Sequence, residues 1–221
     1  HDEAVDGNAA AALADDTTRA ARDLRHQLGA EMLDDLVERA GHRRQRGELR
    51  DQLVAACDGL AALGVDRDRV TVIRNWSHVA SGTGDRVATR RSLGWGDDEV
   101  VVLHAGNMGL KQGLENVVDT ARLADERSSR VRFVLLGDGN QRTALESRGA
   151  GVKRLEFLDP LPGERFPDAL AAADVLLVNE ATTVAEMSVP SKLTSYFTAA
   201  RPVVAASWER SAASAEIRRS G

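Results

Sequence analysis

The most regular pattern of apolar and polar positions lies in the second half of the chain, where short apolar runs alternate with helical repeats. Five apolar or β-branched runs predict strands at 100–104, 130–136, 152–158, 174–178 and 202–206. A segment with apolar residues at helical spacing follows each run, at 113–125, 141–148, 165–173, 191–200 and 214–219. Five strands that alternate with five helices predict an α/β fold, a Rossmann-like parallel sheet covered by helices on both faces.

The first 64 residues show helical periodicity and no strand pattern. Residues 1–16 are rich in alanine and aspartate and are expected to be poorly ordered. Apolar positions recur at helical spacing from Leu24 to Ala40 and again from Leu49 to Leu63, and Gly64 ends the second repeat. We therefore expect a partly disordered helical segment over 1–64 and one nucleotide-sugar-binding domain over 65–221, which begins with a short strand at 69–74 and a short helix at 86–93.

Composition narrows the classes of function. The 221 residues are 43% hydrophobic, which can support a core, and the formal net charge of -5 argues against a nucleic-acid partner. Cys57 is the single cysteine, so neither a disulfide framework nor a cysteine metal site is expected. The chain shows no apolar run as long as a membrane span and no signal peptide, which predicts a cytoplasmic protein. The basic stretch 42–46 leaves peripheral contact with the inner face of a membrane open.

The stretch 100–113, VVVLHAGNMGLKQG, carries the first candidate chemistry. Gly106 and Gly109 allow a tight turn after the strand, and Lys111 lies beside the start of the next helix. Free backbone N–H groups, the positive end of a helix and a lysine form an anion site, and phosphate is the anion that fits best. A tight turn with a solvated lysine is the alternative interpretation.

Polar loops follow four of the predicted strands, at 106–111, 137–139, 159–162 and 179–192. In parallel sheets ligands bind at the carboxyl ends of the strands, so we expect these loops to form one site. His104 ends its strand, and we interpret it as a packed histidine, with ligand contact as the alternative.

Five segments then occur in a fixed order, namely HAGNMGLKQGLENVVDTARL, FVLLGDGNQRTALE, FLDPLP, ADVLLVN and VPSKLTSYFTAARPVVAA. With them, the chain from about Val65 to Gly221 resembles the C-terminal, donor-binding domain of retaining GT-B-fold glycosyltransferases of the family-4 type. The bacterial branch that builds surface polysaccharides is the most similar. The resemblance implies a nucleotide-sugar donor, UDP-linked by family default, and transfer with retention to a saccharide or lipid-linked acceptor, with no metal and no other cofactor.

The resemblance also implies roles for individual residues. The catalytic candidates, which would act at the diphosphate and the donor sugar, are Lys111, Glu186 and Lys192. The donor-binding candidates come from the same five segments and are Gly106, Asn107, Gly109, Gly137, Asp138, Gly139, Leu158, Pro160, Leu161, Pro190, Ser191 and Ser195. Two of these depart from the family pattern, since many relatives have an arginine at Asn107 and a ribose-binding glutamate at Ser195.

A GT-B enzyme also has an acceptor domain, and residues 1–64 do not predict one. Relatives continue beyond residue 221, so we interpret the chain as a donor-binding part that is truncated at its C-terminus. A non-catalytic nucleotide-binding or interaction domain on the same fold is the alternative, and Ser195 favours it. A dinucleotide oxidoreductase is a third interpretation, but the chain lacks G-x-G-x-x-G spacing.

Overall fold

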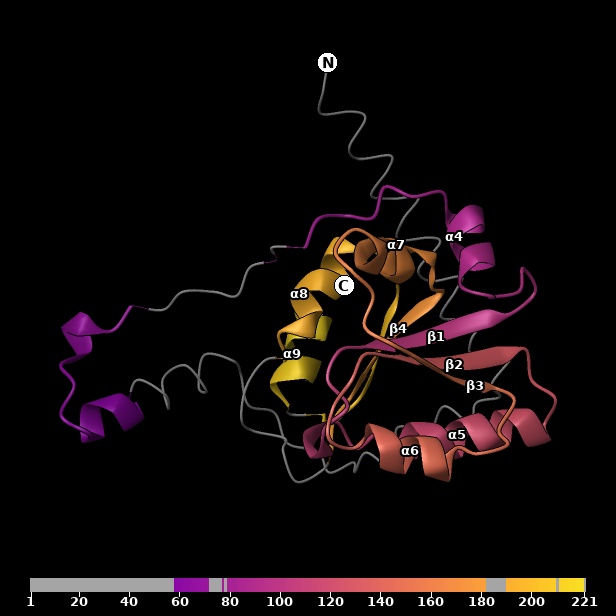
Figure 1. Cartoon of the computed structure of the whole chain (residues 1–221). Coiled ribbons are helices and arrows are strands. Elements are labelled where there is room, and N and C mark those ends of the chain that lie inside the picture. Colours follow the sequence, from indigo (N-terminus) through magenta and orange to yellow (C-terminus); the bar gives the residue numbers. More distant parts are fainter. Residues whose placement is uncertain (1–57, 72–76, 78, 182–189, 210, 221) are drawn as a thin grey trace, which may run out of the picture.

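The centre of the structure, a computed structural model that describes residues 58–71, 77, 79–181, 190–209 and 211–220, is a five-stranded sheet (Figure 1). All neighbouring strands run parallel, in the order β3-β2-β1-β4-β5. The strands are β1 (Val100–Ala105), β2 (Val131–Leu136), β3 (Leu155–Leu158), β4 (Val175–Asn179) and β5 (Val203–Ala206). The sheet confirms the predicted Rossmann-like fold.

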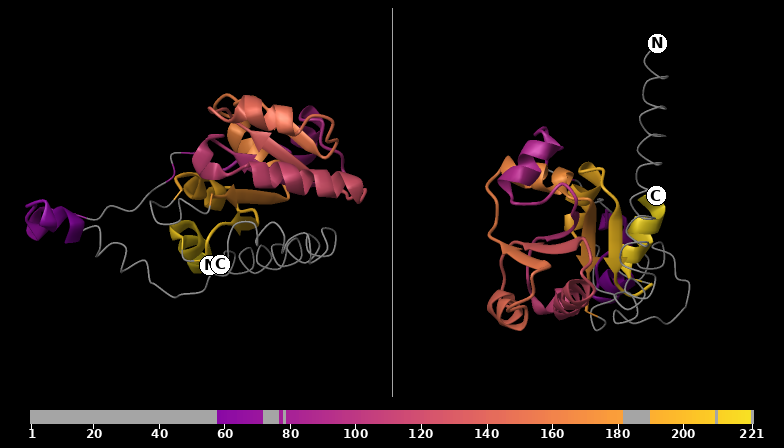
Figure 2. Two further views of the ribbon diagram at one scale, coloured as in Figure 1. Left: turned by 90° about the horizontal axis from the view of Figure 1, so that it is seen from below. Right: turned by 90° about the vertical axis from the view of Figure 1, so that its right-hand side faces the viewer.

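Helices cover both faces of this sheet (Figures 1 and 2). The α-helices in the described part are α4 (Arg86–Ser92), α5 (Glu115–Glu126), α6 (Arg142–Arg148), α7 (Arg165–Ala172), α8 (Lys192–Thr198) and α9 (Ala212–Ser220). The described part also contains the short 3-10 helices η1 (Arg67–Arg69), which lies away from the sheet, and η2 (Leu110–Gln112). Helices α5 and α6 lie on one face, while α7, α8 and α9 lie on the other. Helix α4 packs beside α7.

The position of β1 between two helical layers explains why its apolar run is continuous. Val102 packs into the core with α5, whereas Val101 and Leu103 pack into the opposite core with α7 and α8. Successive side chains of a strand point to opposite faces, so a strand between two helical layers has no polar face. The second core also holds Trp95 and Tyr196, both buried.

The strand order places a topological switch point between β1 and β4. From β1 the chain proceeds through β2 to β3 on one side, and then crosses to β4 and β5 on the other. In open parallel sheets, ligands bind outside the carboxyl ends of the strands at such a point. The fold therefore directs attention to the residues that follow β1 and β4.

The predicted short helix at 86–93 is confirmed by α4, where the Asp85 carboxylate caps the helix by accepting a hydrogen bond from the Ala88 N–H (2.7 Å). The predicted strand at 69–74 is wrong over its described residues, because Arg69 ends η1 and residues 70 and 71 belong to no strand, while residues 72–74 lie outside the described part. Residues 58–62 are helical and Gly64 has a φ of 86°, as expected where a helix ends. The remaining predictions for residues 1–57 also lie outside the described part.

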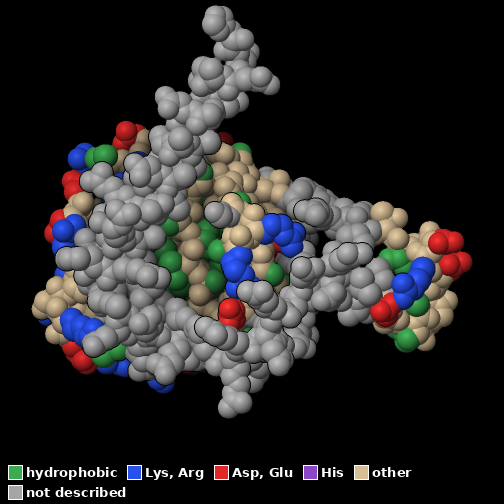
Figure 3. Space-filling view, turned by 180° about the vertical axis from the view of Figure 1, so that it is seen from behind, with side chains coloured by type: hydrophobic (Ala, Val, Ile, Leu, Met, Phe, Trp, Pro, Cys, Tyr) green, Lys and Arg blue, Asp and Glu red, His purple; other side chains and the backbone are tan. Residues whose placement is uncertain are grey.

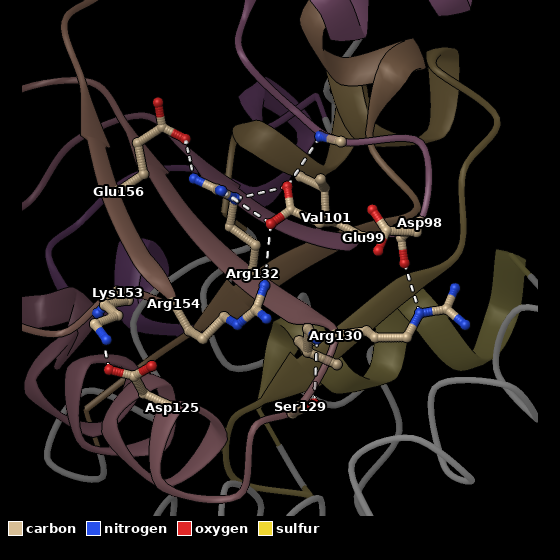
Figure 4. A network of polar contacts seen from close by, with 12 residues as sticks. Asp98, Glu99, Val101, Asp125, Ser129, Arg130, Arg132, Lys153, Arg154 and Glu156 are labelled. Atoms are coloured by element: carbon tan, nitrogen blue, oxygen red, sulfur yellow. Dashed lines mark hydrogen bonds and ion pairs between the residues drawn. The ribbon is translucent and has the colours of Figure 1, made fainter.

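The amino ends of the strands are joined by ion pairs (Figure 4). The Glu99 carboxylate accepts hydrogen bonds from Arg132 Nε and a terminal Arg132 nitrogen, both at 2.9 Å, and from Arg154 at 3.0 Å. Arg132 also pairs with Glu156 on β3 at 3.4 Å. These contacts connect the start of β1 to β2 and β3 at the edge opposite the polar loops.

Candidate functional site

The turns after β1 and β2 are joined by backbone hydrogen bonds. The Gly106 N–H donates to the Leu136 carbonyl and the Met108 N–H donates to the Asp138 carbonyl, both at 2.8 Å. The Met108 carbonyl in turn accepts from the Gln141 N–H at 2.9 Å. The structure thus brings together two of the predicted loops, 106–111 and 137–139.

Gly137 lies where these two turns approach each other most closely. Its φ is 140°, in a region that favours glycine, and a Cβ built there would lie 2.0 Å from the Gly106 carbonyl oxygen. A side chain at this position would force the two turns apart. Packing alone therefore explains this glycine, whatever the site binds.

The loop after β4 is tied to the turn after β1. Asn179 is buried, and its side-chain amide donates to the Gln112 carbonyl (2.7 Å) and the Gly113 carbonyl (3.0 Å). The Ala181 N–H donates to the carbonyl of Lys111 at 2.9 Å, while Lys111 itself is exposed. Sequence reasoning missed Asn179, although a polar residue at the end of the apolar run 175–178 was a signal.

Lys192, the first residue of α8, lies beside the turn after β1. Its Nζ lies 3.0 Å from Nε2 of His104, the buried histidine near the end of β1. Its Cε and Nζ both lie 3.7 Å from the point that a Cβ on Gly106 would occupy. Two residues that sequence reasoning assigned to one phosphate site are therefore neighbours at the β1/β4 switch point.

The electrostatics of this pair follow from burial. Burial lowers the pKa of Lys192 to about 7, and the carboxylate of Glu180 opposes the shift. Burial, with the nearby lysine as the second cause, holds the pKa of His104 well below its ordinary value. His104 is therefore an uncharged imidazole that can accept a hydrogen bond from the lysine.

Glu180 follows β4 and is the acidic group that acts on Lys192. Burial raises the pKa of its carboxyl group, and hydrogen bonding with Ser211 and the charge of Lys192 oppose the rise. Its buried Oε2 atom has no hydrogen-bond partner in the described part of the chain. Sequence reasoning did not single out this residue.

Arg142 links the loops after β2 and β3. Its guanidinium donates to the Gly137 carbonyl (3.0 Å) and pairs with Asp159 (2.6 Å) and Glu146 (2.8 Å). The Leu158 carbonyl, just before Asp159, accepts from the Gly137 N–H at 3.0 Å. Sequence reasoning missed this arginine, because a charged residue in the first turn of a helix is usually solvated.

The family-derived positions near α8 differ in their surroundings. Ser195 is 9% exposed, and its hydroxyl donates to the Lys192 carbonyl within the helix at 3.1 Å. Ser191 is the exposed N-cap residue of α8, and Pro190 precedes it. Glu186 lies outside the described residues.

The other predicted site residues lie in the same loops. The backbone N–H of Gly109 donates to the Gln112 side chain at 3.0 Å, and a Cβ on Gly139 would lie 2.4 Å from the Met108 carbonyl oxygen. Asn107, Asp138 and Pro160 are exposed, whereas Leu161 packs partly against the core. The described candidates therefore share one edge of the sheet, and their contacts with a donor stay predictions.

Two other features of the described ranges bear on the site. In these ranges no group of three or more His, Cys, Asp or Glu side chains is arranged to hold a metal ion. The helices found there are too short or too polar to cross a bilayer. The groups described at this edge include backbone amides and Lys192, which suit an anion, together with the carboxylate of Glu180.

Comparison with known proteins relates the chain to a sequence family and to curated proteins. A sequence model of the family described as "Glycosyl transferases group 1" matches residues 99–220, more than half of the chain. WcaI of Escherichia coli (strain K12), named as a colanic acid biosynthesis glycosyl transferase, is 33% identical over 138 residues, which are 59% of this chain and 33% of WcaI. WbjE of Pseudomonas aeruginosa, named as a glycosyltransferase, is 32% identical over 105 residues, which are 45% of this chain and 25% of WbjE. The chain thus spans about a third or less of these curated relatives.

Solved structures share the fold. HepE of Anabaena in complex with UDP-glucose superposes with a TM-score of 0.54 and 19% identity, over 75% of this chain and 50% of HepE. HepE in complex with UDP and glucose gives a TM-score of 0.53 and 20% identity, over 69% of this chain and 42% of HepE.

Proposed function

Because the chain belongs to the family of group 1 glycosyltransferases, we propose that it is the donor-binding part of a retaining enzyme. It binds a UDP-linked sugar, and the enzyme transfers the glycosyl group to a saccharide or lipid-linked acceptor in polysaccharide biosynthesis. We place the donor, and not the acceptor, on the described residues. In this proposal the protein acts in the cytoplasm or at the inner face of the membrane.

One observation carries the proposal, namely the position of Lys192 beside Gly106 at the switch point. Lys192 is partly buried, and burial penalises its charge and lowers its pKa to about 7. A group that is retained at such a cost suggests a functional charge. A diphosphate is the part of a nucleotide sugar that would use it.

The proposed chemistry is the departure of the donor diphosphate. As the bond between the anomeric carbon and the diphosphate breaks, negative charge grows on the leaving oxygen. Lys111, Lys192 and the backbone N–H groups of the glycine turns would stabilise this charge because they are already in place. Each charged donor would contribute roughly 2–4 kcal/mol of transition-state stabilisation, as oxyanion-binding groups do. Glu186 is the proposed contact of the donor sugar.

The relatives support the chemical class of the substrate. HepE, which shares the fold, is described in complex with UDP-glucose, and WcaI is named for colanic acid biosynthesis. These statements concern those proteins, and they favour a UDP-linked donor and a polysaccharide product for this chain. A metal has no role in the proposed reaction.

Calorimetric titration of the chain with UDP, GDP and NAD tests the proposal. We expect UDP to bind, and we expect Lys111→Ala to weaken the binding about tenfold or more, which corresponds to about 1.4 kcal/mol. Lys153→Ala is the matched control, because it removes an exposed lysine between β2 and β3, away from the site. Binding of GDP in preference to UDP would correct the base, and binding of NAD alone would overturn the proposal.

A further inference from the structure

Lys192 has an unusual partner for a phosphate-binding lysine. Its Nζ lies 3.0 Å from Nε2 and 3.4 Å from Nδ1 of His104, which is fully buried at 0% exposure. Glu180 is the carboxylate that acts on Lys192, yet among the described residues these two groups do not form an ion pair. Among the described residues, the side-chain partner of Lys192 within hydrogen-bond distance is thus an imidazole ring and not a carboxylate.

His104 can hold the lysine only as an uncharged ring. A protonated imidazole would place a second positive charge about 3 Å from the amine in a buried site, which is costly. Burial and the lysine accordingly keep the pKa of His104 far below its ordinary value. A neutral imidazole has one nitrogen without a proton, and this nitrogen can accept a hydrogen bond from Nζ, while hydrogen bonds with the backbone of Asn107 and Leu177 oppose the lowering of the ring's pKa.

Burial also leaves the amine of Lys192 partly uncharged. Burial lowers the pKa of Lys192 to about 7, so in mildly basic solution most chains without ligand carry a neutral amine. A diphosphate that binds at the Gly106 turn brings negative charge next to Nζ. Such a charge favours the ammonium form and raises the pKa of the lysine again.

We propose that His104 is a positioning residue for Lys192, and that the lysine takes up one proton from solvent when the donor diphosphate binds. The inference rests on the proposed function, since it concerns the same donor site. The lone pair of the neutral amine accepts the proton to give the ammonium ion, and no other bond is formed or broken. Donor binding and protonation are therefore linked.

Among the described residues, the groups that face Lys192 come from β1, from the end of β4 and from the turn at Gly106. His104 faces it from β1 and Glu180 from the end of β4, while the turn at Gly106 contributes backbone. Glu180 also titrates, and its pKa is raised by burial. A Glu180→Gln variant separates the contribution of this carboxyl group to proton uptake from that of the lysine.

The test is calorimetric titration of the full chain with UDP at about pH 8, in buffers of different ionisation enthalpy. The terminal phosphate of UDP is fully ionised there, because its second pKa is about 6. We expect uptake of about 0.5–1 proton for each UDP bound, and a Kd that rises several-fold between about pH 7.5 and 8.5. Lys192→Met should abolish the uptake, whereas Lys111→Met and Glu180→Gln should retain it.

Two His104 variants test the positioning role. His104→Leu removes the hydrogen-bond acceptor, so the ammonium form is less favoured and the loss of UDP affinity should begin at lower pH. His104→Gln keeps an acceptor and should move this pH profile back toward that of the original chain. A purely structural role for the histidine would lower affinity equally at every pH.

The outcomes separate the two proposals. UDP binding with proton uptake that depends on Lys192 supports both. UDP binding without proton uptake, or with uptake that survives Lys192→Met, overturns this inference and leaves the proposed function standing. A folded chain that does not bind UDP overturns the proposed function and this inference together.

Discussion

Lys192 is the residue at which the proposed function and stability conflict most directly. Its pKa is lowered from 10.5 to about 7 by burial, so between these values the unfolded chain holds a proton that the folded chain lacks. Stability therefore rises with pH through this window and is lowest below it. The charged form of Lys192 therefore lowers the stability of the folded protein, and in the proposed function a bound anion would interact with this charge.

We predict that Lys192→Met stabilises the chain at about pH 6.5, by on the order of 2–4 kcal/mol. At about pH 9 this advantage should be smaller by about 2 kcal/mol, because the unmodified chain gains stability as its lysine loses the proton. Urea denaturation at the two pH values measures the difference. Lys153→Met, at an exposed position, should show the same difference at both pH values, and equal stability of Lys192→Met and the original chain would contradict the prediction.

Individual site residues could be predicted only where their type is tied to a motif. The candidates Gly106 and Lys192 were proposed in this way, and the structure places them side by side. Asn179 and Arg142 were missed, because amide and guanidinium side chains that bind backbone carbonyls of other loops leave no local pattern. His104 was predicted as a packed residue and is indeed buried, but its contact with Lys192 depends on the approach of β1 and α8.

At the scale of elements, Tyr196 holds α8 against the sheet. Its buried hydroxyl accepts a hydrogen bond from the Ala105 N–H at 2.8 Å and lies 3.3 Å from the carbonyls of Ala105 and Leu177, to which it can donate. Burial raises the pKa of this phenol, so it stays a donor as well as an acceptor. The contact fixes the helix that carries Lys192 to the ends of β1 and β4.

We predict that Tyr196→Phe destabilises the chain by about 1–3 kcal/mol, because the buried Ala105 N–H loses its partner. UDP affinity should fall as well, since the position of Lys192 depends on α8. Thermal or urea unfolding and the UDP titration measure the two effects. Thr198→Val is a control on the same helix, because its hydroxyl bonds only within α8. Unchanged stability of Tyr196→Phe would contradict the role of this hydroxyl.

The sequence predicted which strands and helices form better than it predicted the residues at which they begin and end. Strand β3 starts at Leu155 and not at 152, because the Val152 N–H donates to the Gly149 carbonyl and the Lys153 N–H donates to Asp125. Helix α5 starts at Glu115 and not at 113, because Gly113 adopts a left-handed conformation with φ 55° after the unpredicted η2. Both differences arise from turn hydrogen bonds that an apolar pattern does not encode.

At the scale of the whole molecule, the carboxyl and amino ends of the strands carry different kinds of interaction. The carboxyl edge holds the candidate site, whereas the amino edge is closed by the ion pairs of Glu99 with Arg132 and Arg154 (Figure 4). On the face in Figure 3, the charged side chains of described residues lie mainly along the rim and include both Lys or Arg and Asp or Glu.

We predict that Glu99→Gln costs about 1–3 kcal/mol of stability near pH 7, since two arginines lose their shared counter-ion. Burial raises the pKa of Glu99, but the hydrogen bonds and charges of its partners outweigh this and the pKa is lowered from 4.5. The stabilisation is therefore complete above pH 4.5 and fades as the pH falls through the lowered value. Urea denaturation at neutral and acidic pH should show the two proteins converging in acid, and a constant difference would contradict the prediction.

The sequence by itself determined the class of fold, because alternating apolar runs and helical repeats leave a parallel sheet between two helical layers as the way to bury them. Its motifs also determined the family and most candidate residues. Only the tertiary structure decided the strand order, which puts β1 beside β4 and so brings Lys192 to Gly106 and His104. The physical reason is that strand order, burial and the resulting pKa values depend on contacts between residues far apart in the chain, and local patterns carry no record of these contacts.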